Sequence, residues 1–99
     1  MKEITAKDLA SKLKDSENVS IIDVREDEEV AQGKIPGAKH IPLGQIPERL
    51  NEIDKEKHHF MVCRSGGRSG NACSFLSEQG YDVTNMAGGM LDWEDKVEK

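Results

Sequence analysis

Short apolar runs alternate with amphipathic stretches along this chain. Continuous apolar or β-branched runs of four to eight residues, bounded by turn residues, are typical of buried strands. The pattern predicts such strands at about residues 19–24, 60–62 and 81–86, and a very short strand at 39–41. Turn-forming residues at 15–18 and 33–38 separate these runs from their neighbours.

Between the runs, apolar residues recur at helical spacing. Thr5 and Asp8 resemble a capping box ahead of one such stretch, with Asp in place of the usual Glu. Helices are expected at about 6–14, 26–31, 45–53, from 68 or 69 to Gly80, and over the last residues, which Met90, Trp93 and Val97 mark. Alternation of short strands with helices is typical of an α/β fold with a mainly parallel sheet.

Composition limits the choice further. The 99 residues are expected to form one domain, residues 1–99. With 14 basic and 19 acidic residues the formal net charge is −5, which argues against a nucleic-acid partner. No apolar run approaches the ~20 residues that span a bilayer, so no membrane association is expected. The N-terminus has no apolar signal-peptide core, so a cytoplasmic monomer is the simplest expectation.

Two cysteines, Cys63 and Cys73, are the candidate reactive groups. A structural disulfide is not expected in a reducing compartment. Cys73 lies one helical turn beyond a loop and beside Ala72, so we interpret it as a buried small apolar residue in preference to a resolving thiol. No spacing of His and Cys matches a zinc site, and neither a metal nor another cofactor is expected.

Cys63 opens a glycine-rich loop directly after a predicted buried strand. In open α/β sheets, ligands bind at the carboxyl ends of strands. Gly66 and Gly67 allow several backbone N–H groups to converge on one centre, and such a nest at a helix N-terminus binds anions. Ser65 and Ser69 can add hydroxyl donors.

The charge around the loop agrees with an anion site. No Asp or Glu occurs between residues 57 and 77, whereas Lys57, Arg64 and Arg68 are basic. Such an environment lowers a thiol pKa, but a fall from ~8.5 to ~7 gives only about a threefold net gain in reactivity, because nucleophilicity falls as well. We therefore expect the loop chiefly to bind an anionic substrate and stabilise an anionic intermediate.

Other polar residues are given structural interpretations. Asp23 and Arg25 follow the first predicted strand beside the presumed site, and we expect them to form an ion pair or to anchor a loop. His58 and His59 precede a strand and are expected at the surface, and Trp93 is expected to anchor the last helix in the core.

Four segments together resemble the single-domain rhodaneses over nearly the whole chain. Taken in chain order, they are Ile21–Arg25, the Gly-x-Ile-Pro-Gly-Ala stretch 33–38 with His40-Ile41-Pro42, the Cys63–Ser69 loop, and Gly88-Gly89-Met90 followed by Trp93. The resemblance implies a rhodanese-like fold, with a five-stranded mainly parallel sheet flanked by helices on both faces.

The resemblance also implies a thiosulfate sulfurtransferase. Cys63 would take a sulfane sulfur from a donor such as thiosulfate, become a persulfide, and pass the sulfur to cyanide or a thiol. The loop residues would bind the substrate, the backbone N–H groups of Arg64, Ser65, Gly66, Gly67, Arg68 and Ser69 cradling the persulfide. Arg64 and Arg68 would attract the anionic donor. Two half-reactions imply ping-pong kinetics.

Three alternatives remain open at this point. A persulfide carrier would use Cys63 in the same way but deliver the sulfur to a partner protein. A cysteine phosphatase or arsenate reductase is disfavoured, because those enzymes use Cys-x5-Arg, whereas Cys63 to Arg68 is Cys-x4-Arg and Ser69 occupies the phosphatase position. A purely structural or phosphate-binding glycine loop would leave the basic stretch unexplained.

Overall fold

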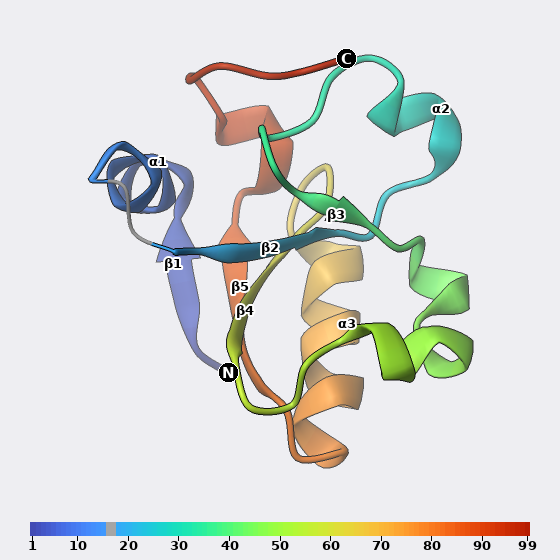
Figure 1. The fold of residues 1–99 in the computed structure, drawn as a ribbon. Coiled ribbons are helices and arrows are strands. Elements are labelled where there is room, and N and C mark those ends of the chain that lie inside the picture. Colours follow the sequence, from blue (N-terminus) through green and yellow to red (C-terminus); the bar gives the residue numbers. More distant parts are fainter. Residues whose placement is uncertain (16–17) are drawn as a thin grey trace.

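The computed structural model describes residues 1–15 and 18–99. Within them runs a five-stranded sheet of order β1-β5-β4-β2-β3, in which every pair of neighbours is parallel (Figure 1). The strands are β1 (Glu3–Thr5), β2 (Ser20–Asp23), β3 (Lys39–His40), β4 (His58–Val62) and β5 (Asp82–Ala87). The α/β class and the parallel sheet predicted from the sequence are confirmed.

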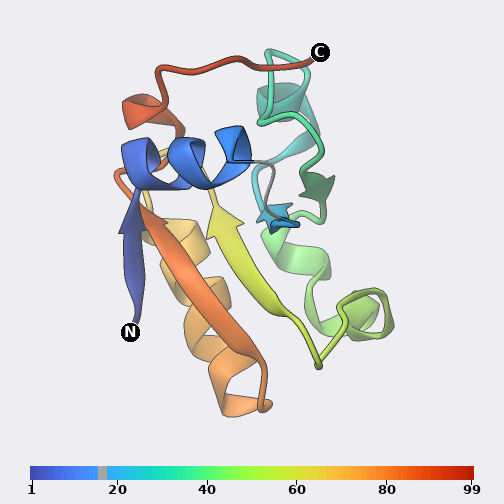
Figure 2. The same cartoon turned by 60° about the vertical axis from the view of Figure 1, so that its left-hand side comes forward.

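Helices cover both faces of this sheet (Figures 1 and 2). The helices are α1 (Ala6–Lys14), α2 (Asp27–Val30) and α3 (Gly67–Glu78), with short 3-10 helices η1 (Leu43–Gln45), η2 (Pro47–Glu52) and η3 (Gly89–Asp92). Because successive strand residues point to opposite faces, Ile22 and Met61 pack in the core beneath α3, whereas Ile21 and Val62 pack beneath α1. None of the described helices is long and apolar enough to cross a membrane.

Local sequence explains the start of α1. The backbone N–H of Asp8 donates to the Thr5 hydroxyl oxygen at 3.1 Å, so Thr5 caps the helix as predicted. Of the turn expected at residues 15–18, Ser16 and Glu17 lie outside the described residues.

Three local predictions were wrong. The expected helix at 45–53 is two 3-10 helices, with Arg49 outside helical geometry (φ −115°, ψ 23°). The expected last helix is a single 3-10 turn, because Trp93 is extended (ψ 118°) and its indole N–H donates to the Lys96 carbonyl at 2.9 Å. His59, expected at the surface, is buried; its ring bonds the Asp54 carbonyl and the Ser20 hydroxyl, both at 2.6 Å.

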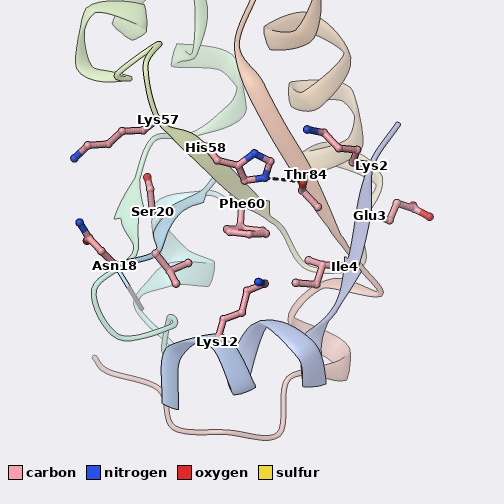
Figure 3. Close-up of a pocket in the computed structure, with 11 residues that line it drawn as sticks. Lys2, Glu3, Ile4, Lys12, Asn18, Ser20, Lys57, His58, Phe60 and Thr84 are labelled. Carbon is pink, nitrogen blue, oxygen red and sulfur yellow. Dashed lines mark hydrogen bonds between the residues drawn. The ribbon is translucent and has the colours of Figure 1, made fainter. Parts of the chain in front are cut away.

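A hollow larger than the one beside the Cys63 loop lies elsewhere on the described part of the chain. It has a volume of about 770 Å³ and lies between α1 and the amino-terminal half of the sheet (Figure 3). Ile4, Val19 and Phe60 supply apolar surface, and His58 lies between Thr84 and Asp82, at 2.7 Å and 2.8 Å. These groups form a cross-strand network and include no cysteine, so size alone does not identify the reactive site.

Candidate active site

The carboxyl ends of β2, β4 and β5 meet at one edge of the sheet. Asp23 pairs with Val62 in register, and the Val24 N–H donates to the Val62 carbonyl at 2.8 Å. Cys63 follows β4 at this edge, and residues 63–66 lead into α3. Gly66, at φ +103°, provides the left-handed turn that starts the helix, a conformation that favours glycine. The topology therefore places Cys63 where α/β proteins bind ligands.

The Cys63 sulfur is cradled by hydrogen-bond donors. The side chain is 1% exposed, with the Gly66 N–H at 3.0 Å and the Ser69 hydroxyl at 3.3 Å from Sγ. Burial raises the pKa of the thiol, but the Ser69 hydroxyl and the loop N–H groups together hold that pKa below its ordinary value. Hydrogen bonds, more than the arginine charge invoked from the sequence, are thus the cause of the lowered pKa.

Asn85 holds this cradle in place from β5. Its Oδ1 accepts from the Ser69 hydroxyl at 2.5 Å, and its Nδ2 donates to the Gly66 carbonyl at 3.1 Å. Asn85 is buried at 4% exposure. Asn85 was not among the residues expected at the site, although a polar side chain inside a predicted strand needs a hydrogen-bond partner if it is buried, and this is a signal in the sequence.

The turn that contains Gly88 and Gly89, directly after β5, contacts the backbone of the Cys63 loop. The N–H of Met90 donates to the Cys63 carbonyl at 2.8 Å, and that of Leu91 donates to the Arg64 carbonyl at 3.0 Å. Gly89 lies so close that a Cβ there would stand 2.5 Å from the Arg64 carbonyl oxygen. The segment after β5 therefore supports the Cys63 loop through its backbone.

Asp23 and Arg25 form a buried ion pair beside the loop. Arg25 Nη2 lies 2.8 Å from Asp23 Oδ2, and the same nitrogen donates to the Gly33 carbonyl at 2.8 Å. Both side chains are under 10% exposed, at 0% for Asp23 and 6% for Arg25. The pair ties the end of β2 to the segment that follows α2.

Arg68 is bound by an acidic side chain that the sequence analysis did not connect with the site. Its Nη1 and Nη2 atoms lie 2.7 Å from the two carboxylate oxygens of Glu29 in α2. This bidentate pair lowers the pKa of Glu29 to about 2 and raises that of Arg68. The basic stretch 57–77 is therefore partly neutralised in three dimensions.

Arg64, Ser65 and Gly67 are the exposed members of the Cys63–Ser69 loop. Arg64 borders a hollow of about 370 Å³. Its other sides are formed by Arg25, which is paired with Asp23, by Glu28, Glu29 and Gln32, and by the η3 residues Met90 and Leu91. Leu91 is 62% exposed. The hollow beside the loop is therefore lined by cationic, acidic, amide and apolar side chains.

Cys73 differs from Cys63 in the direction in which its surroundings shift the pKa of the thiol. It is fully buried in α3, and burial raises the pKa of its thiol to about 11. Cys73 packs in the same core cluster as Leu76 and Val83, in agreement with its interpretation as an apolar core residue.

Comparison with known proteins identifies the family. The family model described as a rhodanese-like domain matches residues 5–96. The chain belongs to the rhodanese family. This rhodanese domain is 48% identical over 97 residues to the putative sulfurtransferase YtwF of Bacillus subtilis, covering 98% of this chain and 94% of the relative.

Other relatives extend the comparison. A sulfurtransferase of Allochromatium vinosum is 44% identical over 92% of this chain and 86% of its own length. The putative sulfur carrier protein YrkF of Bacillus subtilis is 39% identical over 97% of this chain, but over only 52% of its own length. The crystal structure of a rhodanese-like domain protein from Staphylococcus aureus superposes with a TM-score of 0.94 at 44% identity, covering 99% of this chain and 97% of that one. The rhodanese-like fold expected from the sequence is confirmed.

The arrangement in this rhodanese domain suits a soft nucleophile that must carry negative charge. Donors converge on Sγ of Cys63 from one side, and they would stabilise a thiolate or a charged sulfur attached to it. Ser69 holds the position of the phosphatase arginine and donates to the sulfur, while the arginine one residue earlier turns to Glu29. The loop therefore lacks an arginine at the position where cysteine phosphatases close around a phosphate.

Proposed function

We propose that this domain transfers a sulfane sulfur from an anionic donor, thiosulfate being the model, to a thiophilic acceptor through a persulfide on Cys63. The observation that carries the proposal is the cradle of the Ser69 hydroxyl and loop N–H groups around a cysteine whose pKa is lowered. The family and the names of its relatives support sulfurtransferase activity in general.

In the first half-reaction the Cys63 thiolate attacks the outer sulfur of thiosulfate. A bond forms between Sγ and that sulfur, the bond to the sulfonate sulfur breaks, and its electron pair leaves on sulfite. In the second half-reaction the acceptor, cyanide or a thiolate, attacks the outer sulfur, and Cys63 leaves as a thiolate. This is covalent catalysis in two steps with ping-pong kinetics.

The loop residues take distinct roles in this scheme. The N–H groups of the loop, from Arg64 through Gly67 to Ser69, bind the terminal sulfur of the persulfide. Arg64, exposed at the mouth, attracts the donor and the departing sulfite. Asp23 and Arg25 fix the neighbouring strand end, and the Arg25 guanidinium, which also lines the hollow, is engaged by the Asp23 carboxylate.

Mass spectrometry of the intact protein tests the proposal directly. After incubation with thiosulfate and removal of excess reagent, the wild type should gain the mass of one sulfur atom, and cyanide should remove it. Cys63→Ser should gain nothing, whereas Cys73→Ser, which leaves the loop intact, should behave like the wild type. Failure of the wild type to gain sulfur, or a gain that persists in Cys63→Ser, would contradict the proposal.

A sulfur-relay role is the second candidate, favoured by one observation. The relative named as a putative sulfur carrier protein aligns with 97% of this chain. A relay would form the same persulfide but release it slowly to cyanide or small thiols. Steady-state turnover with thiosulfate and cyanide separates the two, because only the enzyme sustains many cycles with small molecules.

A further inference from the structure

The Glu29–Arg68 pair engages one of the two loop arginines that were expected from the sequence to attract an anionic donor. Both guanidinium nitrogens Nη1 and Nη2 are engaged, each at 2.7 Å from a different carboxylate oxygen. The Arg68 side chain is 33% exposed and the Glu29 side chain 27%, so the pair is neither fully buried nor free in solvent. Planar bidentate geometry of this kind is strong and directional.

Glu29 is fixed independently of Arg68. The Glu26 N–H donates to Glu29 Oε1 at 3.0 Å, which completes a capping box on α2. Arg25 Nη1 also donates to the Glu29 backbone carbonyl at 3.4 Å. The carboxylate is therefore already in place, beside the hollow that Arg64 borders, before any donor arrives.

Because Glu29 pairs with Arg68, the surface beside the Cys63 loop carries less net positive charge than the loop sequence suggests. Of the two arginines in the Cys63 loop, Arg68 has a carboxylate partner, and Arg64 has none among residues 1–15 and 18–99. The loop sequence contains two arginines, but among the described residues a doubly charged donor meets only one, Arg64, that has no carboxylate partner. The negative charge of Glu29 also acts directly on any anion in the hollow that it lines.

We propose that Glu29 is a specificity-determining residue that sets the charge preference of the donor site, by neutralising Arg68 and so weakening the capture of doubly charged sulfur donors relative to singly charged ones. This inference rests on the proposed sulfur transfer at Cys63. The sulfur chemistry is the same for both donor classes, and Glu29 changes only which donor is captured.

Two donors of different charge provide the test. Thiosulfate carries two negative charges, and methanethiosulfonate, CH3–SO2–S⁻, carries one. Each gives its outer sulfur to the Cys63 thiolate, and the electron pair of the broken S–S bond leaves on sulfite or on methanesulfinate. Because the Coulomb energy is proportional to charge, a change at Glu29 should affect thiosulfate about as the square of its effect on methanethiosulfonate.

Glu29→Gln is the decisive variant. Glutamine keeps an oxygen that can accept from Arg68 and from the Glu26 N–H, but it removes the charge. We expect kcat/KM for thiosulfate to rise on the order of three- to tenfold, and kcat/KM for methanethiosulfonate by about the square root of that factor. The gain should shrink as salt is added, since screening weakens it.

Asp27→Asn is the matched control. It makes the same change in net charge on the same helix, but Asp27 is 88% exposed and does not line the hollow. Its kcat/KM for thiosulfate should stay within about twofold of the wild type, since a fully exposed charge outside the hollow is screened by water and salt. An equal gain in Asp27→Asn would overturn the proposal, because net charge alone would then explain the effect.

A double-mutant cycle guards against a purely structural role. Arg68→Met should lower kcat/KM for thiosulfate, because it leaves the Glu29 carboxylate uncompensated, and Arg68→Met with Glu29→Gln should recover most of the loss. If both single variants and the double variant lose activity together with melting temperature, the pair is structural and the proposal fails. Persulfide formation on the wild type is measured separately by mass spectrometry. A failure of sulfur transfer itself is thereby distinguished from a failure of the proposed role of Glu29.

Discussion

At the scale of single residues, the site balances burial against hydrogen bonding. Cys63 is almost inaccessible, which disfavours the thiolate, and the donors around Sγ more than compensate. Ser69 is the most important of them, yet its single hydroxyl proton has two acceptors, Sγ at 3.3 Å and Asn85 Oδ1 at 2.5 Å. The reactivity of Cys63 therefore depends on a hydroxyl that β5 holds in position.

Removing that hydroxyl should raise the pKa of Cys63. In Ser69→Ala the sulfur loses its leading donor, so we expect the pKa of the Cys63 thiol to rise and the thiolate fraction at pH 7 to fall. Thiolate absorbance near 240 nm against pH measures the change. Ser74→Ala, an exposed serine on the same helix, is the control and should titrate like the wild type. An unchanged midpoint in Ser69→Ala would show that the backbone donors suffice.

The Asp23–Arg25 pair also leads to a prediction at this scale. Arg25→Met leaves a carboxylate at 0% exposure without its cation, and breaking a buried pair in this way costs about 3–5 kcal/mol. Urea denaturation measures the loss. Arg49→Met, which breaks an exposed pair with Glu52, should cost far less. Equal losses would mean that burial does not govern the contribution of the Asp23–Arg25 pair.

At the scale of elements, the turn after β5 is as much a part of the site as the loop after β4. Gly89 has φ +57° and lies against the backbone of Cys63 and Arg64. The turn and the loop are joined by two backbone hydrogen bonds, so neither can shift alone. Space for the loop is therefore controlled by a residue that has no side chain.

Gly89→Ala should separate a steric effect from backbone strain. Its Cβ would stand 2.5–2.6 Å from the Arg64 and Cys63 carbonyl groups, so the loop must move, and we expect persulfide formation to fall at least tenfold. Gly37→Ala carries a similar strain at φ +81° but has open space around the added atom. It should cost about 1–2 kcal/mol in urea denaturation and leave sulfur transfer intact. Equal sulfur transfer in the two variants would contradict this role for Gly89.

Some of the strands and helices could be predicted from local sequence patterns, and others could not. Runs such as Phe60–Val62 predict their strands because burial on both faces requires continuous apolar residues. β1 has one apolar residue in three, and pairing with β5 stabilises it, a contact no local pattern contains. The helical spacing of Met90 and Trp93 was misleading, because both side chains pack on the core beneath α1 without a helix to carry Trp93.

The same limit applies to the site. Cys63 and its loop were predictable, because a glycine-rich turn at a strand end is a local feature. Glu29 was not predictable, since it reaches Arg68 from 39 positions away. Glu29 belongs to the acidic run 26–29, and nothing local connects that run with the loop. Asn85 shares β5 with the polar residues Asp82 and Thr84, so its position in the sequence did not set it apart.

At the scale of the whole molecule, the acidic groups make the fold sensitive to acid. Ion pairs and hydrogen bonds lower the pKa values of Glu29, Glu52 and Asp82 to about 2. A carboxyl whose pKa is lowered by folding stabilises the native state above its unfolded pKa, near 4, and this contribution is lost as the pH falls through the folded value. Stability should therefore fall between about pH 4.5 and pH 2.

Urea denaturation at a series of pH values measures this. The midpoint should be level from pH 7 to pH 5 and drop below pH 4.5. In Glu29→Gln the drop should be shallower, because one of the three groups is gone. A midpoint that rises on acidification would show that relief of the net charge of −5 outweighs these pairs.

The order of the strands has a consequence for synthesis. β1 finds its partner only in β5, and the Cys63 loop is anchored by the N–H groups of Met90 and Leu91. A growing chain therefore emerges from the ribosome with Cys63 exposed and its cradle unbuilt. Nearly all of these residues must leave the ribosome before β1 can pair with β5. The Cys63 thiol is therefore buried and made reactive in the same late, cooperative folding step.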